Sequence, residues 1–199
     1  MIRRLAALAL PLLLLAGCGG DAEPAPSQPS APIPFAACAG LTTAPAVGPA
    51  DTTAAAGTAP VELPSFGLAC FNGGEEIVLA DLRGPAVVNL WASWCPPCRK
   101  ELPAFQRLAE RADGRLHVIG VNAADDREAA RALGERYGLT FPNLFDGDDQ
   151  LRGAFGRNFL PMTLLVDAEG QVRHLDSSGA LDDAALDALI GQYLGVELS

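Results

Sequence analysis

The 199-residue sequence is short of positive charge, with 14 lysines and arginines against 24 aspartates and glutamates and a formal net charge of −10. Nucleic-acid binding needs a basic patch facing the phosphates, so this balance argues against a nucleic-acid partner. After residue 18 there is no long apolar run, no internal repeat and no nucleotide- or flavin-binding motif. What remains is room for one ordinary domain with a tail, and 49% hydrophobic residues are enough to build its core.

Metal ligands are also scarce. The two histidines, His117 and His174, lie in predicted strands and have no ligand spacing. The only CxxC pair, Cys95 and Cys98, supplies two of the four ligands of a structural zinc site, and no second pair follows it. The acidic run at 146–149 lacks the remaining positions of a calcium loop and is typical of a turn and helix cap. We therefore expect no metal site and no cofactor.

The first 17 residues have the features of a bacterial lipoprotein signal. Two arginines precede the apolar run 5–16, which is too short to span a bilayer comfortably. The run ends in Leu-Ala-Gly-Cys and resembles a lipobox, in which Cys18 becomes the lipidated N-terminus; a plain signal peptide with a chance cysteine is the alternative. Residues 18–34 form a Pro/Ala-rich linker. We expect a membrane-anchored, extracytoplasmic protein in a compartment that permits disulfides.

The cysteine count then predicts a structural disulfide. The chain has five cysteines, and four remain once Cys18 is assigned to the lipid. Cys95 and Cys98 form one close pair. Exported proteins rarely leave two thiols idle, so we predict that Cys38 and Cys70 are bonded to each other. Two separate buried thiols are the alternative.

The rest of the chain alternates between predicted strands and helices. Residues 35–66 are rich in Ala, Thr, Pro and Gly and are expected to be an irregular N-terminal extension, with the folded domain at 67–199. The expected strands are a short one within 75–84 that leads into a turn, then 86–92, 116–122, 161–167 and 171–175. The expected helices follow Cys95, cover 126–137 with Asp125 as N-cap and Glu128 completing a capping box, and cover 182–194. The prediction is an α/β fold with a central mixed sheet and helices on both faces.

The sequence Cys95-Pro96-Pro97-Cys98 stands where a buried strand passes into a helix. A cysteine at a helix N-terminus has its thiolate stabilised by unpaired N–H groups and the helix dipole, which favours nucleophilic attack. Pro96 suits the first helical turn, where its missing N–H is no loss. Because the two prolines remove amide donors, we expect weaker thiolate stabilisation, and a more reducing couple, than a His-containing dipeptide would give.

The segment NLWASWCPPCRKELP, residues 89–103, resembles the active-site segment of membrane-tethered thioredoxin-like thiol–disulfide oxidoreductases, the group of the cytochrome c maturation reductases. The similarity covers roughly residues 60–195. It implies a thioredoxin-like fold in which the helix 126–137 is an extra insertion. The segment FLPMTLLVDAEG implies that Pro161 is a cis-proline preceded by Leu160, facing the two cysteines.

The resemblance also implies a role for each site residue. Cys95 would be the nucleophile and Cys98 the resolving cysteine. Glu101 would relay a proton beneath the dithiol, the more so because Asn89 stands where cytosolic thioredoxins have a buried acid; a solvated helix glutamate is the alternative. Pro161 completes the catalytic set. The residues expected to contact the substrate are Trp94, Pro96, Pro97 and Leu160, while Trp91 is expected in the core, Pro103 is structural, and Met162 departs from the usual Thr.

The function expected from this resemblance is reduction of protein disulfides, such as those of apocytochrome c, with a membrane protein as electron donor or acceptor. A monomer is expected, and the sequence does not fix the direction of electron flow. One alternative is a thiol-dependent peroxidase on the same fold, for which Arg99 is the only close guanidinium. The other is a non-enzymatic metal carrier.

Overall fold

The computed structural model describes residues 32–45 and 60–198. The signal predicted at 1–17, Cys18 and most of the predicted linker lie outside these described residues, so the lipid anchor remains a prediction. None of the helices found in the two described segments has the length and apolar character needed to span a bilayer.

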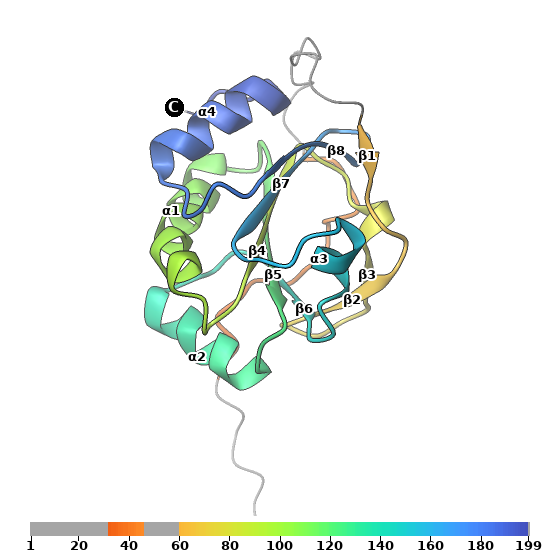
Figure 1. Ribbon diagram of the computed structural model, residues 1–199. Coiled ribbons are helices and arrows are strands. Elements are labelled where there is room, and N and C mark those ends of the chain that lie inside the picture. The colour runs from red at the N-terminus through yellow and green to blue at the C-terminus, as the bar shows by residue number, and fades with distance from the viewer. Residues whose placement is uncertain (1–31, 46–59, 199) are drawn as a thin grey trace, which may run out of the picture. The chain divides into compact units, whose positions relative to one another are not determined.

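The elements alternate between strands and helices along the chain (Figure 1). The strands are β1 (Val61–Glu62), β2 (Gly67–Cys70), β3 (Ile77–Val78), β4 (Ala86–Trp91), β5 (His117–Ala123), β6 (Asn143–Asp146), β7 (Met162–Val166) and β8 (Gln171–Asp176). The helices are α1 (Pro96–Ala112), α2 (Arg127–Tyr137), α3 (Gln150–Ala154) and α4 (Asp183–Leu194), with a 3-10 turn at Leu79–Asp81. The short strand and turn expected within 75–84 are therefore confirmed as β3 and this turn.

These strands form one mixed sheet in the order β1-β8-β7-β4-β5-β6-β2-β3. Neighbours β4, β5 and β6 run parallel, and all other neighbouring pairs are antiparallel. Every residue of β4, with the sequence AVVNLW, is buried. A continuous apolar run suits this central strand because it is covered on both faces.

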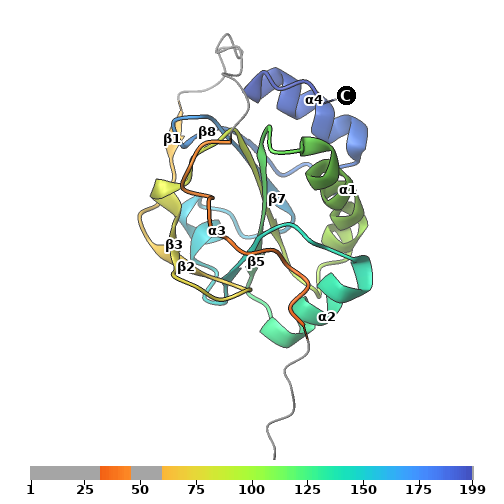
Figure 2. The same cartoon turned by 180° about the vertical axis from the view of Figure 1, so that it is seen from behind.

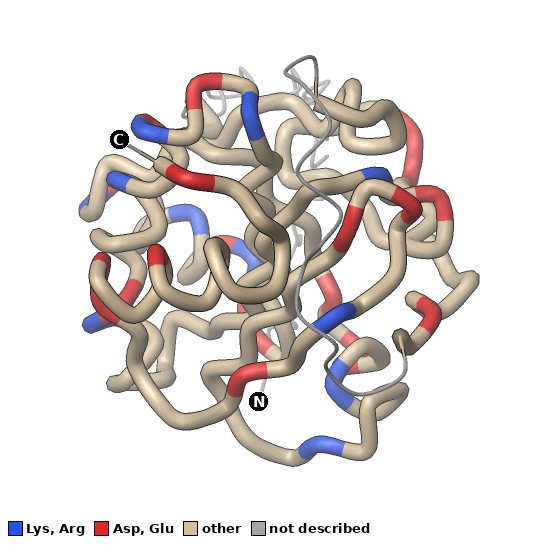
Figure 3. Tube along the Cα trace, turned by 90° about the horizontal axis from the view of Figure 1, so that it is seen from above, with Lys and Arg blue, Asp and Glu red and all other residues tan. Residues whose placement is uncertain are grey.

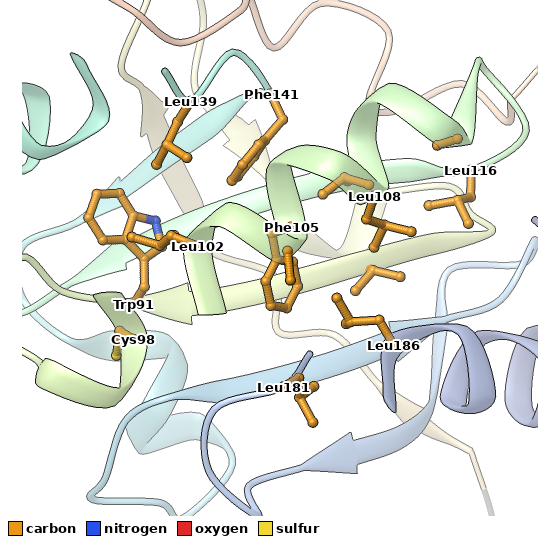
Figure 4. Close-up of a cluster of buried hydrophobic side chains, with 14 of the residues drawn as sticks. Trp91, Cys98, Leu102, Phe105, Leu108, Leu116, Leu139, Phe141, Leu181 and Leu186 are labelled. Atoms are coloured by element: carbon orange, nitrogen blue, oxygen red, sulfur yellow. The ribbon is translucent and has the colours of Figure 1, made fainter. Parts of the chain in front are cut away.

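The two faces of the sheet carry separate hydrophobic clusters. On one face, α1 and α4 lie side by side, as Figures 1 and 2 show from opposite directions. The cluster beneath them contains Trp91, Cys98, Phe105 and Leu186, and Figure 4 shows it running along α1. On the other face, α3 and the 3-10 turn cover a second cluster. The α/β fold with helices on both faces is thus confirmed.

Ion pairs on the surface join α1 to α4. Arg107 donates to both oxygens of Asp183, at 3.1 and 2.6 Å, and Arg111 donates to both oxygens of Asp187, at 3.1 and 2.9 Å. Such exposed pairs contribute little individually, and their bidentate geometry mainly fixes how the two helices lie. In Figure 3 the lysines and arginines are dispersed among the acidic residues, with no basic stripe on the face shown.

Four elements of the fold were not predicted from the sequence, among them β1, which lies within the segment 35–66 that was expected to be irregular. The strands β2 and β6 and the short helix α3 lie in segments without a strong apolar period; β2 joins the sheet through only two residue pairs with β6.

The predicted N-cap of α2 is wrong by one residue. Asp126 is the cap, and its side chain accepts a hydrogen bond from the amide of Ala129 at 2.8 Å. Asp125 is occupied by other partners, described below.

The N-terminal extension packs into the domain. The ring of Phe35, which is 1% exposed, meets Phe71 edge-on at 4.9 Å and lies 6.3 Å from Trp91. Further on, β1 pairs with β8 and so adds a strand to the sheet. The predicted disulfide between Cys38 and Cys70 is present, with a Cα–Cα distance of 6.0 Å, and it ties the extension to β2.

Loss of this disulfide should weaken the fold. It joins cysteines 32 residues apart, and closing a loop of that size stabilises the folded state by about 3 to 4 kcal/mol in the chain-entropy model. The double substitution Cys38→Ala with Cys70→Ala should lower the free energy of unfolding by about that amount. Urea titration followed by far-UV circular dichroism measures it. An unchanged urea midpoint would contradict a structural role.

Candidate active site

The Cys95–Cys98 pair lies at the point where the central strand passes into α1. Strand β4 ends at Trp91, and four residues later Cys95 occupies the N-cap position of α1 with an extended backbone. Its Sγ accepts a hydrogen bond from the amide of Cys98 at 3.2 Å. Pro96 fills the first helical position, where an N–H is not needed. This is the helix N-terminus that the sequence predicts.

The two cysteines form a disulfide that is almost completely enclosed. Their Cα atoms are 5.3 Å apart, Cys95 is 2% exposed and Cys98 is 0% exposed. Any sulfur from outside must therefore approach Cys95. The Cys38–Cys70 disulfide belongs to the other hydrophobic cluster, on the opposite face of the sheet, so the structure separates the two bonds.

A cis-proline lies beside the start of this helix. The peptide bond between Leu160 and Pro161 is cis. Because Met162 of β7 pairs with Leu90 of β4, Pro161 comes next to the end of β4 that leads to the cysteines. The side chain of Leu160 packs against the cluster that contains both cysteines. The structure thus brings together the dithiol and the Leu160–Pro161 segment, which the sequence separates by more than 60 residues.

Glu101 lies one turn beyond Cys98 and is 0% exposed. The alternative of a solvated helix glutamate is therefore wrong. Its Oε1 accepts a hydrogen bond from Asn89 Nδ2 at 2.6 Å, and its Oε2 accepts one from the amide of Leu181 at 3.1 Å. Burial raises the pKa of Glu101 to about 7, although both hydrogen bonds act in the opposite direction; the negative charge of Asp176 raises it further. A carboxyl group with such a pKa can take up or release a proton near neutral pH.

Asn89, which donates to Glu101, is itself buried with one of its polar atoms unpaired in the described structure. Asn89 is 0% exposed, and its Oδ1 has no hydrogen-bond partner among the residues that the structure describes. Buried polar atoms are normally paired, so this oxygen is available to accept a hydrogen bond. The Asn89 side-chain amide can turn either its donor or its acceptor end toward Glu101.

The two tryptophans have different environments. Trp91 is fully buried and its indole donates to Asn143 Oδ1 at 2.8 Å, which confirms the prediction of a core residue. Trp94, directly before Cys95, is 54% exposed, and its indole donates to the carbonyl of Ala124 at 2.9 Å. A second exposed aromatic residue, Phe159, precedes the cis-proline segment and is 40% exposed. The surface around the disulfide is therefore partly apolar, as a site for polypeptide chains should be.

One side chain near the dithiol was assigned a different role from the sequence. Asp125 accepts hydrogen bonds from Ser93, two residues before Cys95, and from Asn122. The pairing could not be found from sequence spacing, because the residues involved are 32 apart along the chain. The only local signal was a second aspartate beside the true helix cap.

The two histidines are held by contacts remote from the dithiol. His117 Nε2 lies 3.0 Å from the carbonyl of Thr43, and the ring of His174 stacks on that of Tyr193 with centroids 4.0 Å apart. Within residues 32–45 and 60–198, no group of three or more His, Cys, Asp or Glu side chains is placed to hold a metal.

Known proteins resemble this chain over the segment that carries these residues. The thiol-disulfide oxidoreductase ResA of Geobacillus thermodenitrificans is 35% identical over 114 residues, which cover 56% of this chain and 65% of the relative. The thiol:disulfide interchange protein DsbE of Pseudomonas fluorescens biotype C is 38% identical over 112 residues, 55% of this chain and 61% of the relative. The chain thus spans slightly less than two thirds of the length of these curated relatives.

The fold has solved counterparts as well. The structure of a thiol:disulfide interchange protein of the thioredoxin family from Chlorobium tepidum superposes with a TM-score of 0.58 at 25% identity, covering 70% of this chain and all of the other. This likeness confirms the thioredoxin-like fold. The AhpC/TSA family model matches residues 61–175, from the start of β1 to one residue before the end of β8, and takes in the dithiol, Glu101 and the cis-proline. Since that match covers more than half of the sequence, the chain belongs to the AhpC/TSA family, in its thioredoxin-like form.

Proposed function

We propose that the protein is an extracytoplasmic thiol–disulfide oxidoreductase that reduces disulfides of protein substrates, such as those of apocytochrome c. The observation that carries the proposal is the enclosed Cys95–Cys98 disulfide at the N-terminus of α1, with a cis-proline beside it. The names of the relatives support the same chemistry. Lipid attachment at Cys18, a membrane protein as electron donor and a monomeric state belong to this proposal.

The first step is attack by the reduced protein. The Cys95 thiolate, favoured by the helix N-terminus, attacks one sulfur of the substrate disulfide. A bond forms between Cys95 Sγ and that sulfur, and the substrate disulfide breaks. Its other sulfur leaves as a thiolate and takes a proton from water. The product is a mixed disulfide between protein and substrate.

The second step resolves the mixed disulfide. The Cys98 thiol gives its proton to Glu101, one turn along the helix, and the resulting thiolate attacks Cys95 Sγ. The bond between protein and substrate breaks, and the second substrate sulfur leaves as a thiolate and is protonated. Two electrons have then passed to the substrate, and the protein is left with the disulfide seen here. A dithiol of the membrane donor restores the reduced form by the same exchange in reverse.

The reduction potential tests the direction of this reaction. We expect a value near or below about −270 mV, that of thioredoxin, when the protein is equilibrated with dithiothreitol and glutathione buffers. Insulin should be reduced with dithiothreitol as electron source, and no meaningful consumption of hydrogen peroxide should be seen. A potential near about −120 mV, that of the strong periplasmic oxidants, would instead indicate a disulfide donor.

The two prolines should keep this potential low. Within the described part of the chain, Cys95 Sγ accepts a hydrogen bond from the amide of Cys98 alone, and Pro96 and Pro97 have no N–H to donate. Pro97→His restores one amide and adds an imidazole, so it should stabilise the thiolate and raise the potential by roughly 30 mV or more. Glu110→His, on the exposed part of the same helix, is the matched control. Equal potentials for the protein and Pro97→His would contradict the role given to the prolines.

A further inference from the structure

One carboxylate ties the segment before the dithiol to the connection between β5 and α2. Oδ2 of Asp125 accepts from the Ser93 amide at 2.5 Å and from Asn122 Nδ2 at 2.8 Å. Oδ1 accepts from Ser93 Oγ at 2.7 Å and from the amide of Asp126 at 2.9 Å. Both oxygens are thus used twice. We call these four hydrogen bonds the Asp125 clamp.

A second contact runs between the same two segments. The indole N–H of Trp94 donates to the carbonyl of Ala124, the residue before Asp125. Ala124 has a φ of +51°, a left-handed conformation that non-glycine residues adopt only where their surroundings hold them. Its amide donates to the carbonyl of Asp146 at 3.0 Å, so the residue is fixed from both sides.

The clamped segment has little other regular support. Strand β4 ends at Trp91, and α1 begins after Cys95, so Ala92–Trp94 lies outside both elements. Just before this segment, Asn122 Nδ2 donates to the carbonyl of Trp91 at 3.4 Å. Just after it, the amide of Cys95 donates to the carbonyl of Ala92 and closes a turn. Between these points, the Ser93 amide and hydroxyl are both bound to Asp125. The direction in which the chain enters the helix cap at Cys95 therefore depends on this carboxylate.

We propose that Asp125 is a positioning residue for thiol–disulfide exchange, which holds Cys95 at the helix cap and keeps the Trp94 indole bonded to the carbonyl of Ala124. The part that concerns exchange rests on the proposed function; the part that concerns the position of Trp94 does not. Asp125 reacts with nothing itself. It acts through Ser93 and through the carbonyl of Ala124.

A carboxylate is needed because all four groups around it are donors. Asparagine has the same shape, but its amide presents an acceptor on one side only. Whichever way the amide of Asp125→Asn turns, its NH₂ group faces a backbone N–H, that of Ser93 or that of Asp126, which cannot accept. At least one hydrogen bond is therefore lost and two N–H groups oppose each other. Ser93→Ala is a milder change because it removes one bond and brings no two donors together.

The test compares Asp125→Asn with Asp126→Asn in the full chain. The control removes the same charge one residue away, and asparagine caps a helix about as well as aspartate. Hydrogen exchange of the Trp94 indole N–H, followed by NMR, should become faster by roughly 10-fold or more in Asp125→Asn and stay unchanged in the control. The buried Trp91 indole, bound to Asn143, is an internal reference for global unfolding and should not change.

Insulin reduction provides the second readout. In Asp125→Asn, kcat/KM should fall by roughly 10- to 100-fold because the attacking sulfur is misplaced, with Ser93→Ala in between and the control at the wild-type value. Unchanged indole exchange in Asp125→Asn would overturn the clamp. Faster exchange with unchanged kcat/KM would overturn its role in catalysis. If the unsubstituted protein reduces no disulfide, the proposed function fails, and indole exchange still decides whether Asp125 positions Trp94.

Discussion

Cys98→Ser should turn the protein from a catalyst into a trap. In this variant Cys95 still attacks a substrate disulfide, but nothing resolves the mixed disulfide, so the covalent complex accumulates. Turnover in insulin reduction should fall to background, by roughly 1,000-fold or more, as expected for loss of a group that forms and breaks bonds in every cycle. Non-reducing electrophoresis shows the complex as a larger species that dithiothreitol releases.

Cys95→Ser is the matched control for this trap. It should be equally inactive but should form no complex, because Cys98 is 0% exposed and cannot reach a substrate sulfur. Both variants change one sulfur to oxygen and leave the Cys38–Cys70 disulfide in place, so differences in folding are small. Adducts formed through Cys98 in the Cys95→Ser variant would contradict this assignment and show that Cys98 can attack the substrate.

Local sequence patterns could predict the parts of the site that depend on local chemistry. The CPPC motif follows a buried strand and begins a helix, and cysteine counting was enough to pair Cys38 with Cys70. The cis-proline at Pro161 followed from family resemblance. Each of these needs only a short stretch of chain, or a simple rule about compartments, to be recognised.

The parts that sequence patterns alone did not show depend on contacts between distant segments. Glu101 was expected beneath the dithiol from the family resemblance only, because its hydrogen bonds come from Asn89 on β4 and from the amide of Leu181, 80 residues away, and nothing on its own helix shows this. The segment that contains β2 lacks an apolar period, and that strand is placed by pairing with β6 and by the disulfide. In the sequence Asp125 looks like a helix cap. In the structure its carboxylate instead accepts hydrogen bonds from the amide and the hydroxyl of Ser93.

The stability of the oxidised protein should depend on pH through Glu101. Its pKa is about 7 in the folded protein against 4.5 ordinarily, so between these values the folded state holds a proton that the unfolded state has lost. The stabilisation is complete below about pH 4.5 and disappears as the pH rises through 7. A difference of this size corresponds to about 3 kcal/mol in the free energy of unfolding. Urea titrations from pH 5 to 8 should show this decrease.

Glu101→Gln should remove this decrease because the amide does not titrate. Glu110→Gln, an exposed acid on the same helix, should leave it in place. In catalysis, Glu101→Gln should slow resolution of the mixed disulfide by roughly 100-fold, the usual effect of losing a general base. Because Glu101 has to be ionised to accept the Cys98 proton, kcat of the unsubstituted protein should rise through pH 7, and this rise should vanish in Glu101→Gln. A wild-type free energy of unfolding that does not change between pH 5 and 8 would contradict the buried, titrating carboxyl group.

Asn89 explains how the fold tolerates both forms of Glu101. The ionised carboxylate accepts from Asn89 Nδ2, as observed, while Asn89 Oδ1 has no partner in segments 32–45 and 60–198. A protonated Glu101 has an O–H to donate, and rotation of the amide would present Oδ1 to receive it. Aspartate at position 89 would instead compete with Glu101 for the same proton. A neutral amide in β4 therefore leaves Glu101 without a competing acid at position 89, one turn from Cys98, which gives up a proton in the proposed mechanism.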